Sequence, residues 1–109
     1  MGYRSEVALS LSENANELFL ENLKEIPEIQ TLVNNCEWSD PNHGRYYWSW
    51  VKWYDSYPEV DAMEKFLDFL DAVDHETYGF VRIGEDEEDI SRRGSPCVHD
   101  MYVNRSIEW

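Results

Sequence analysis

The order of apolar and polar residues predicts a strand followed by helices. Segment 3–11 alternates apolar and polar side chains, the pattern of a half-buried strand. From 15 to 26 apolar residues recur at intervals of three and four, as on one face of a helix. Pro27 lacks the N–H that an interior helical residue donates, so the helix is expected to end there. A short second helix is predicted over 28–35.

The rest of the chain predicts a hairpin, a helix and further strands. Turn-forming residues at 40–44 separate the strand-like segments 37–38 and 45–54, which favours a hairpin. A capping box at 56–59 opens a helix with one apolar face that is expected to end near His75. The remaining predictions are a strand over 78–83, a loop over 92–96 and a last strand over 98–109.

Two amphipathic helices need a surface to cover, and a mainly antiparallel sheet supplies one. The sequence therefore predicts an α+β fold, a two-layer sandwich with the helices on one face of the sheet. The order strand, helix, hairpin, helix, strand, strand favours ferredoxin-like connectivity as the first hypothesis. With 109 residues, 42% of them hydrophobic, the chain is expected to form a single domain over 1–109.

Negative charge is concentrated in one part of the chain. The formal net charge is −14, and residues 59–89 hold twelve acids against two bases. Such a field repels phosphate backbones and anionic lipid, which argues against direct DNA binding and membrane association. It attracts a basic protein partner. The alternative is that the acidity serves solubility alone.

The acidic residues suggest a partner-binding surface. Glu64, Asp68 and Asp71 recur at helical spacing, so they are expected to form a solvated ladder that resembles the charge of a nucleic-acid backbone. The candidate carboxylates are Asp61, Glu64, Asp68, Asp71, Glu85, Asp86, Glu87, Glu88 and Asp89. The run 85–89 lacks the alternate ligand spacing of a calcium loop, so no metal or cofactor is expected.

Aromatic residues dominate the predicted strand 45–54. Alternation places Tyr46, Trp48 and Trp50 on one face, either as core or as a partly open contact surface with Trp48 and Trp50 as anchors. The same three side chains could instead stack a small ligand or single-stranded RNA, although a basic groove is lacking.

Catalytic motifs are lacking in the sequence. It has no Gly-x-Ser-x-Gly segment and no phosphate-binding glycine loop, and its many acids show no directed pairing. The chain is therefore predicted not to be an enzyme. Two cysteines and no signal-like or membrane-spanning segment favour a cytoplasmic location with reduced thiols.

Three segments carry a resemblance: Gly2–Val7 (GYRSEV), Trp53–Pro58 (WYDSYP) and Phe80–Asp86 (FVRIGED). Together they resemble small proteins encoded by tailed bacteriophages and prophages. The resemblance implies an accessory protein in the host cytoplasm and carries over no functional residues. The expected function is to bind and block a basic, nucleic-acid-handling host protein. The alternatives are a ligand- or RNA-binding sheet protein and a structural virion component, and a homodimer is also considered.

Overall fold

The computed structural model describes residues 4–54, 56–85, 89–99, 101–103 and 107–108. Their elements, in chain order, are β1 (Ser5–Leu11), α1 (Glu13–Glu25), α2 (Pro27–Asn34), β2 (Trp38–Asp40), β3 (Arg45–Val51), α3 (Pro58–Val73), η1 (His75–Thr77), β4 (Tyr78–Ile83), β5 (Ile90–Gly94), η2 (Pro96–His99), β6 (Tyr102–Val103) and β7 (Ile107–Glu108).

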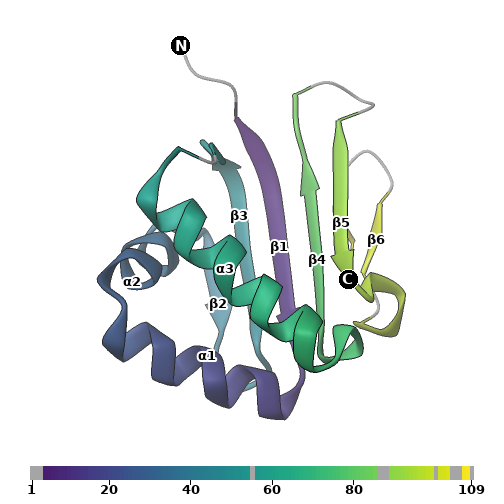
Figure 1. Cartoon of the computed structure of the whole chain (residues 1–109). Coiled ribbons are helices and arrows are strands. Elements are labelled where there is room, and N and C mark those ends of the chain that lie inside the picture. The colour runs from purple at the N-terminus through teal and green to yellow at the C-terminus, as the bar shows by residue number, and fades with distance from the viewer. Residues whose placement is uncertain (1–3, 55, 86–88, 100, 104–106, 109) are drawn as a thin grey trace.

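The predicted α+β sandwich is confirmed. Five antiparallel strands form a sheet in the order β2-β3-β1-β4-β5, and α1, α2 and α3 all cover one face (Figure 1). The first four strands have the predicted ferredoxin-like order, and β5 extends the sheet beyond β4. A small hairpin of β6 and β7 is separate from this sheet.

The late part of the chain differs from the prediction. Residues 92–94, predicted as part of a loop, belong to β5, where Arg92 pairs with Val81 and Arg93 with Phe80. Pairing with the neighbouring strand outweighs the local preference of this polar segment. The predicted last strand over 98–109 is also wrong, because its first residues belong to the 3-10 helix η2, and among the described residues after η2 the strands are the short β6 and β7.

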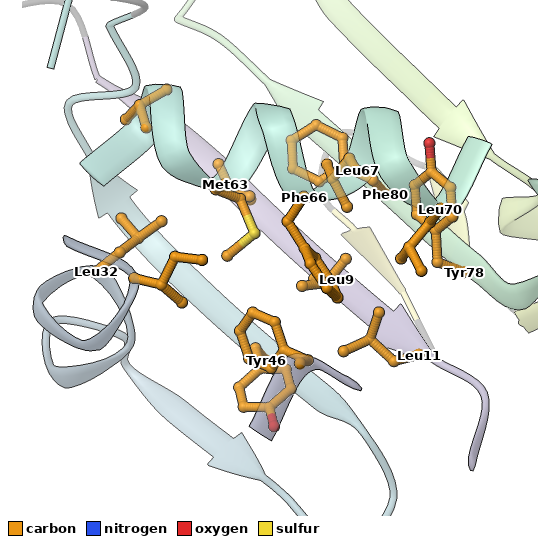
Figure 2. Close-up of a cluster of buried hydrophobic side chains, with 14 of the residues drawn as sticks. Leu9, Leu11, Leu32, Tyr46, Met63, Phe66, Leu67, Leu70, Tyr78 and Phe80 are labelled. Atoms are coloured by element: carbon orange, nitrogen blue, oxygen red, sulfur yellow. The ribbon is translucent and has the colours of Figure 1, made fainter. Parts of the chain in front are cut away.

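The main core lies between α3 and the sheet. Figure 2 shows α3 side chains such as Met63 and Phe66 above Leu9 of β1 and Tyr46 of β3. The buried members on α3 are Val60, Met63, Phe66, Leu67 and Leu70, and Phe19 of α1 and Leu32 of α2 close the core from the side. Full burial of each large apolar side chain contributes about 1.5–3 kcal/mol.

Two buried polar contacts fix the aromatic residues of β3 in this core. The Tyr46 hydroxyl donates to Asn16 Oδ1 at 3.1 Å, and Trp48 Nε1 donates to the Leu32 carbonyl at 2.9 Å. Burial raises the pKa of Tyr46 to about 12, aided by the nearby Cys36 and Asp40. These bonds satisfy polar atoms that would otherwise be costly to bury.

Gly44, the turn residue before β3, gives a test of how this strand joins the fold. Its φ is +68°, and a Cβ there would lie 2.5 Å from the Leu11 carbonyl oxygen. We expect Gly44→Ala to lower the free energy of unfolding by about 1–3 kcal/mol in urea denaturation, since both the backbone conformation and the contact are unfavourable for alanine. Ser49→Ala, at an exposed position of β3, should change it by less than about 0.5 kcal/mol. Equal effects would contradict the expectation.

Candidate functional site

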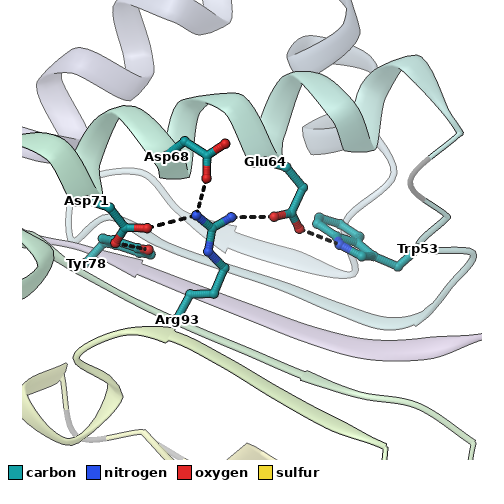
Figure 3. Close-up of polar contacts among 6 residues, drawn as sticks. All are labelled: Trp53, Glu64, Asp68, Asp71, Tyr78 and Arg93. Atoms are coloured by element: carbon teal, nitrogen blue, oxygen red, sulfur yellow. Dashed lines mark hydrogen bonds and ion pairs between the residues drawn. The ribbon is translucent and has the colours of Figure 1, made fainter.

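The carboxylates predicted to form a ladder on α3 converge on one arginine of the sheet. The Arg93 guanidinium contacts Glu64 and lies 2.6 Å from Asp68 Oδ1 and 2.9 Å from Asp71 Oδ2 (Figure 3). Positions 64, 68 and 71 share a helix face. Arg93 stands opposite Phe80 in the sheet, below α3. This carboxylate–arginine cluster therefore fastens α3 to β5.

Two aromatic residues extend the cluster. Trp53 Nε1 donates to Glu64 Oε1 at 3.2 Å, and the Tyr78 hydroxyl donates to Asp71 Oδ1 at 2.7 Å. Burial acts to raise the pKa of Asp71, but the hydrogen bonds from Tyr78 and Arg93 and the Arg93 charge prevail, so this pKa lies below its ordinary value. Burial acts to lower the pKa of Arg93, and its bonds to Asp71 and Asp68 raise it instead. The charged forms are therefore stabilised within the fold.

These three carboxylates share one helix face as predicted, but they are not free charges, because all three contact Arg93. Glu64 is 30% exposed, Asp71 41% and Asp68 70%, so one guanidinium partly neutralises a face that remains in contact with solvent. Asp61, one turn earlier, pairs with Lys65 at 3.1 Å. The spacing of Glu64, Asp68 and Asp71 predicts that they share a helix face. It does not identify Arg93 as their counter-ion, because Arg93 lies more than 20 residues away in the sequence.

The acidic run at 85–89 is divided between two environments. Glu85 is exposed, while Asp89 lies 2.7 Å from the Arg82 guanidinium, which also donates to Ser5 and Ser91. Asp86, Glu87 and Glu88 lie outside the described residues. Asp89 thus contributes to a structural ion pair.

The aromatic strand does not present the predicted face. Trp48 is 1% exposed and Trp50 is 62% exposed, because the β1–β3 register shifts between them. Ser49 and Trp50 together stand opposite the single residue Glu6, which is the geometry of a β-bulge. The prediction of Trp48 as a surface anchor is wrong, since it belongs to the core, and Tyr46 is buried with it. Trp50 alone of the three remains available for contact.

A groove between α1 and α3 was not predicted. It has a volume of about 640 Å³. Leu18 of α1 and Phe69 of α3, which are 36% and 49% exposed, line its apolar part. Recognition of the groove requires the two helices to be placed side by side. The sequence signal was Phe69, a large apolar residue outside the core stripe of its helix.

Carboxylates surround this groove. Glu21, Glu25, Glu28 and Asp61 line it together with Lys65. Within the described part of the chain, Glu21, Glu25 and Glu28 have no ion-pair partner, so only Asp61 is neutralised, by Lys65. A groove lined by both apolar side chains and unpaired acids suits a ligand that is itself apolar on one side and basic on the other.

Charge is divided between the two layers of the molecule. The three α-helices carry ten carboxylates and two lysines, a net charge of −8. Strands β1 to β5 carry two carboxylates and four arginines, a net charge of +2. Among these elements the excess of negative charge therefore lies in the helices, which also line the groove.

The described residues include neither a membrane-spanning helix nor a metal-binding cluster. None of the helices there combines the length and apolar character needed to span a membrane. No group of three or more His, Cys, Asp or Glu side chains in this part of the chain is arranged to hold a metal ion.

Replacement of Arg93 tests the cluster. Arg93→Met should lower the free energy of unfolding by about 2 kcal/mol, because it removes charged hydrogen bonds and leaves three carboxylates close together. This loss should be smaller than the cost of breaking a fully buried ion pair, about 3–5 kcal/mol, because Asp68 and Asp71 are well exposed. Arg92→Met makes the same charge change at the next, exposed position of β5 and should cost less than about 0.5 kcal/mol in urea denaturation. Similar losses in both variants would refute the role of the cluster.

Tyr78→Phe tests the lowered pKa of Asp71. A carboxyl with a lowered pKa stabilises the folded state above its unfolded pKa, and the contribution disappears as the pH falls through the folded value. At neutral pH we expect Tyr78→Phe to lower the free energy of unfolding by about 1 kcal/mol. This loss relative to the native chain should shrink below pH 3.8, the ordinary pKa of the Asp71 carboxyl. Urea denaturation from neutral pH to below pH 3.8 measures the loss, and Tyr57→Phe is the control. A difference independent of pH would count against the bond.

Comparisons with known proteins find no match: no family model matches the chain, and neither does a curated protein or a solved structure.

Proposed function

We propose that this chain is an acidic interaction protein that binds a basic amphipathic helix of a partner protein in the groove between α1 and α3. The observation that carries the proposal is an apolar groove that opens in the helical layer, whose net charge is −8. The site differs from the predicted ladder, but the expected chemistry of the partner is the same.

Apolar contact would provide the anchor. Leu18 and Phe69 leave large apolar surfaces exposed in the groove, and a partner's leucine or phenylalanine side chains would cover them. Interface energy is usually concentrated in a few such buried contacts. Phe69, half exposed and next to the buried Phe66, with ring centroids 6.5 Å apart, is the best-supported anchor.

Charge would provide orientation and speed of association. Glu21 and Glu25 come from α1 and Glu28 from α2, so lysine or arginine side chains along one side of the partner's helix could pair with all three. Complementary charge increases the association rate more than it increases affinity, and it is screened by salt.

The resemblance to phage proteins supports a more specific partner. A bacterial host protein that handles nucleic acid carries basic surfaces of the required kind. Occupation of such a surface by this chain would block it sterically, with the helical layer in place of the nucleic acid. The RNA-binding alternative has less support, because Tyr46 and Trp48 are buried.

Charge reversal at Glu25 tests the groove. The probe is a fluorescent amphipathic peptide of leucine and lysine with leucines at helical spacing, and the same composition in scrambled order is the peptide control. Glu25→Lys should weaken binding about tenfold in fluorescence anisotropy. Glu17→Lys is the matched control: it is exposed on the same helix, outside the groove, and also places a lysine four residues from Glu21.

Phe69→Ser should weaken binding by a similar factor, and Val73→Ser, at an exposed apolar position of α3 outside the groove, should not. Equal effects of Glu25→Lys and Glu17→Lys would show only general attraction between opposite charges. Equal binding of the scrambled peptide would likewise contradict recognition by the groove.

A further inference from the structure

A serine and a histidine are paired on the face of the sheet opposite the α-helices. Ser10 lies on β1, between the core residues Leu9 and Leu11, and points to the other side of the sheet. Its Oγ is 3.1 Å from Nδ1 of His99, a residue of η2 that is 89 positions later in the chain. The second ring nitrogen of His99, Nε2, is 3.0 Å from the Glu76 carbonyl oxygen.

These contacts determine the tautomer of the imidazole. A carbonyl oxygen only accepts hydrogen bonds, so Nε2 must carry a proton and donate to Glu76. In the neutral ring Nδ1 is then the acceptor, and the Ser10 hydroxyl donates to it. A hydroxyl bonded to a histidine that a third group orients is the arrangement that activates a nucleophile.

The fold builds this pair through Gly79. Gly79 of β4 is the cross-strand neighbour of Ser10. A Cβ at position 79 would lie 2.8 Å from Met101 Sδ, 3.0 Å from Pro96 Cα and 3.3 Å from His99 Cβ. Because glycine leaves this space open, η2 packs directly on the sheet and places the imidazole beside Ser10.

The pair opens onto a cavity. Ser10 and His99 line a depression of about 480 Å³ together with Arg45, the cross-strand neighbour of Ser10 on β3. The other polar residues of its wall are His43 and Asp40, whose Nδ1 and Oδ2 are 2.7 Å apart. A purely structural role does not require a hydroxyl here, since Ala8 is completely buried on the same face of β1.

We propose that Ser10 and His99 form a catalytic pair that hydrolyses small carboxylic esters. Ser10 Oγ forms a bond to the ester carbonyl carbon while its proton moves to His99 Nδ1, and the carbonyl π electrons move to the oxygen. Arg45, a residue of the same cavity wall, supplies positive charge for that oxyanion. Collapse breaks the bond to the alcohol, which takes the proton from His99. Water then attacks the acyl-serine with the same proton transfers and releases the acid.

A fluorophosphonate probe, which phosphonylates only activated serines, tests the pair. In the native chain we expect the probe on Ser10, located by tandem mass spectrometry, together with hydrolysis of p-nitrophenyl acetate. Ser10→Ala should abolish labelling, and His99→Gln should reduce labelling and hydrolysis about 100-fold or more through loss of the general base. Ser49→Ala removes an exposed serine of β3 and should leave both unchanged.

Labelling at another residue, or no labelling of the folded native chain, would overturn the proposal. So would labelling of Ser10 that His99→Gln does not change. Thermal denaturation checks that each variant folds. If Ser10→Ala does not fold, the labelled position in the native chain and the His99→Gln comparison still decide the outcome. Peptide binding in the α1–α3 groove is a separate measurement, so either proposal can fail alone.

Discussion

Burial of the central strand β1 on both of its faces organises the whole molecule. This strand pairs with β3 on one side and β4 on the other, and Val7, Ala8 and Leu9 are all completely buried. Consecutive residues of a strand face opposite sides, so both faces of the sheet must be covered at its centre. The α-helices cover one face, and Met101 packs against Ala8 and Val81 on the other. The groove lies among the α-helices on the first face, and the Ser10–His99 pair lies on the opposite face, where η2 packs.

The charge of the molecule has two separate physical roles. On the side of α3 that faces β5, carboxylates bind Arg93 and hold the helix to the sheet. On the side that faces α1, and along α1 itself, carboxylates line the groove. The first set is paired within the chain and contributes to stability. The second set is largely unpaired within the described residues and contributes a field that a partner can use. A single count of net charge cannot distinguish them.

Local pattern predicted the elements better than their contacts. The strand over 78–83 and the apolar face of the helix Pro58–Val73 follow from spacing, and the structure has both. The predicted capping box at 56–59 is wrong, because the helix is capped at Tyr57 without a side-chain hydrogen bond. The faces of β3 were predicted from simple alternation, which one extra residue interrupts. The Arg93 cluster, the groove and the approach of His99 to Ser10 all join segments far apart in the sequence. They depend on strand order and helix placement, which apolar spacing does not encode.

The bulge in β3 also has a consequence for insertions and deletions. Ser49 and Trp50 are both exposed, so the identity of either side chain matters little to the core. In a strand without a bulge, two residues between Trp48 and Val51 would turn Val51 and Trp53 away from the helices, and the bulge keeps both packed against the core. Loss of one codon at this point would remove the bulge and leave a regularly alternating strand, with both side chains still directed toward the helices. Related chains should therefore tolerate the loss of one of these two residues as well as changes in their composition.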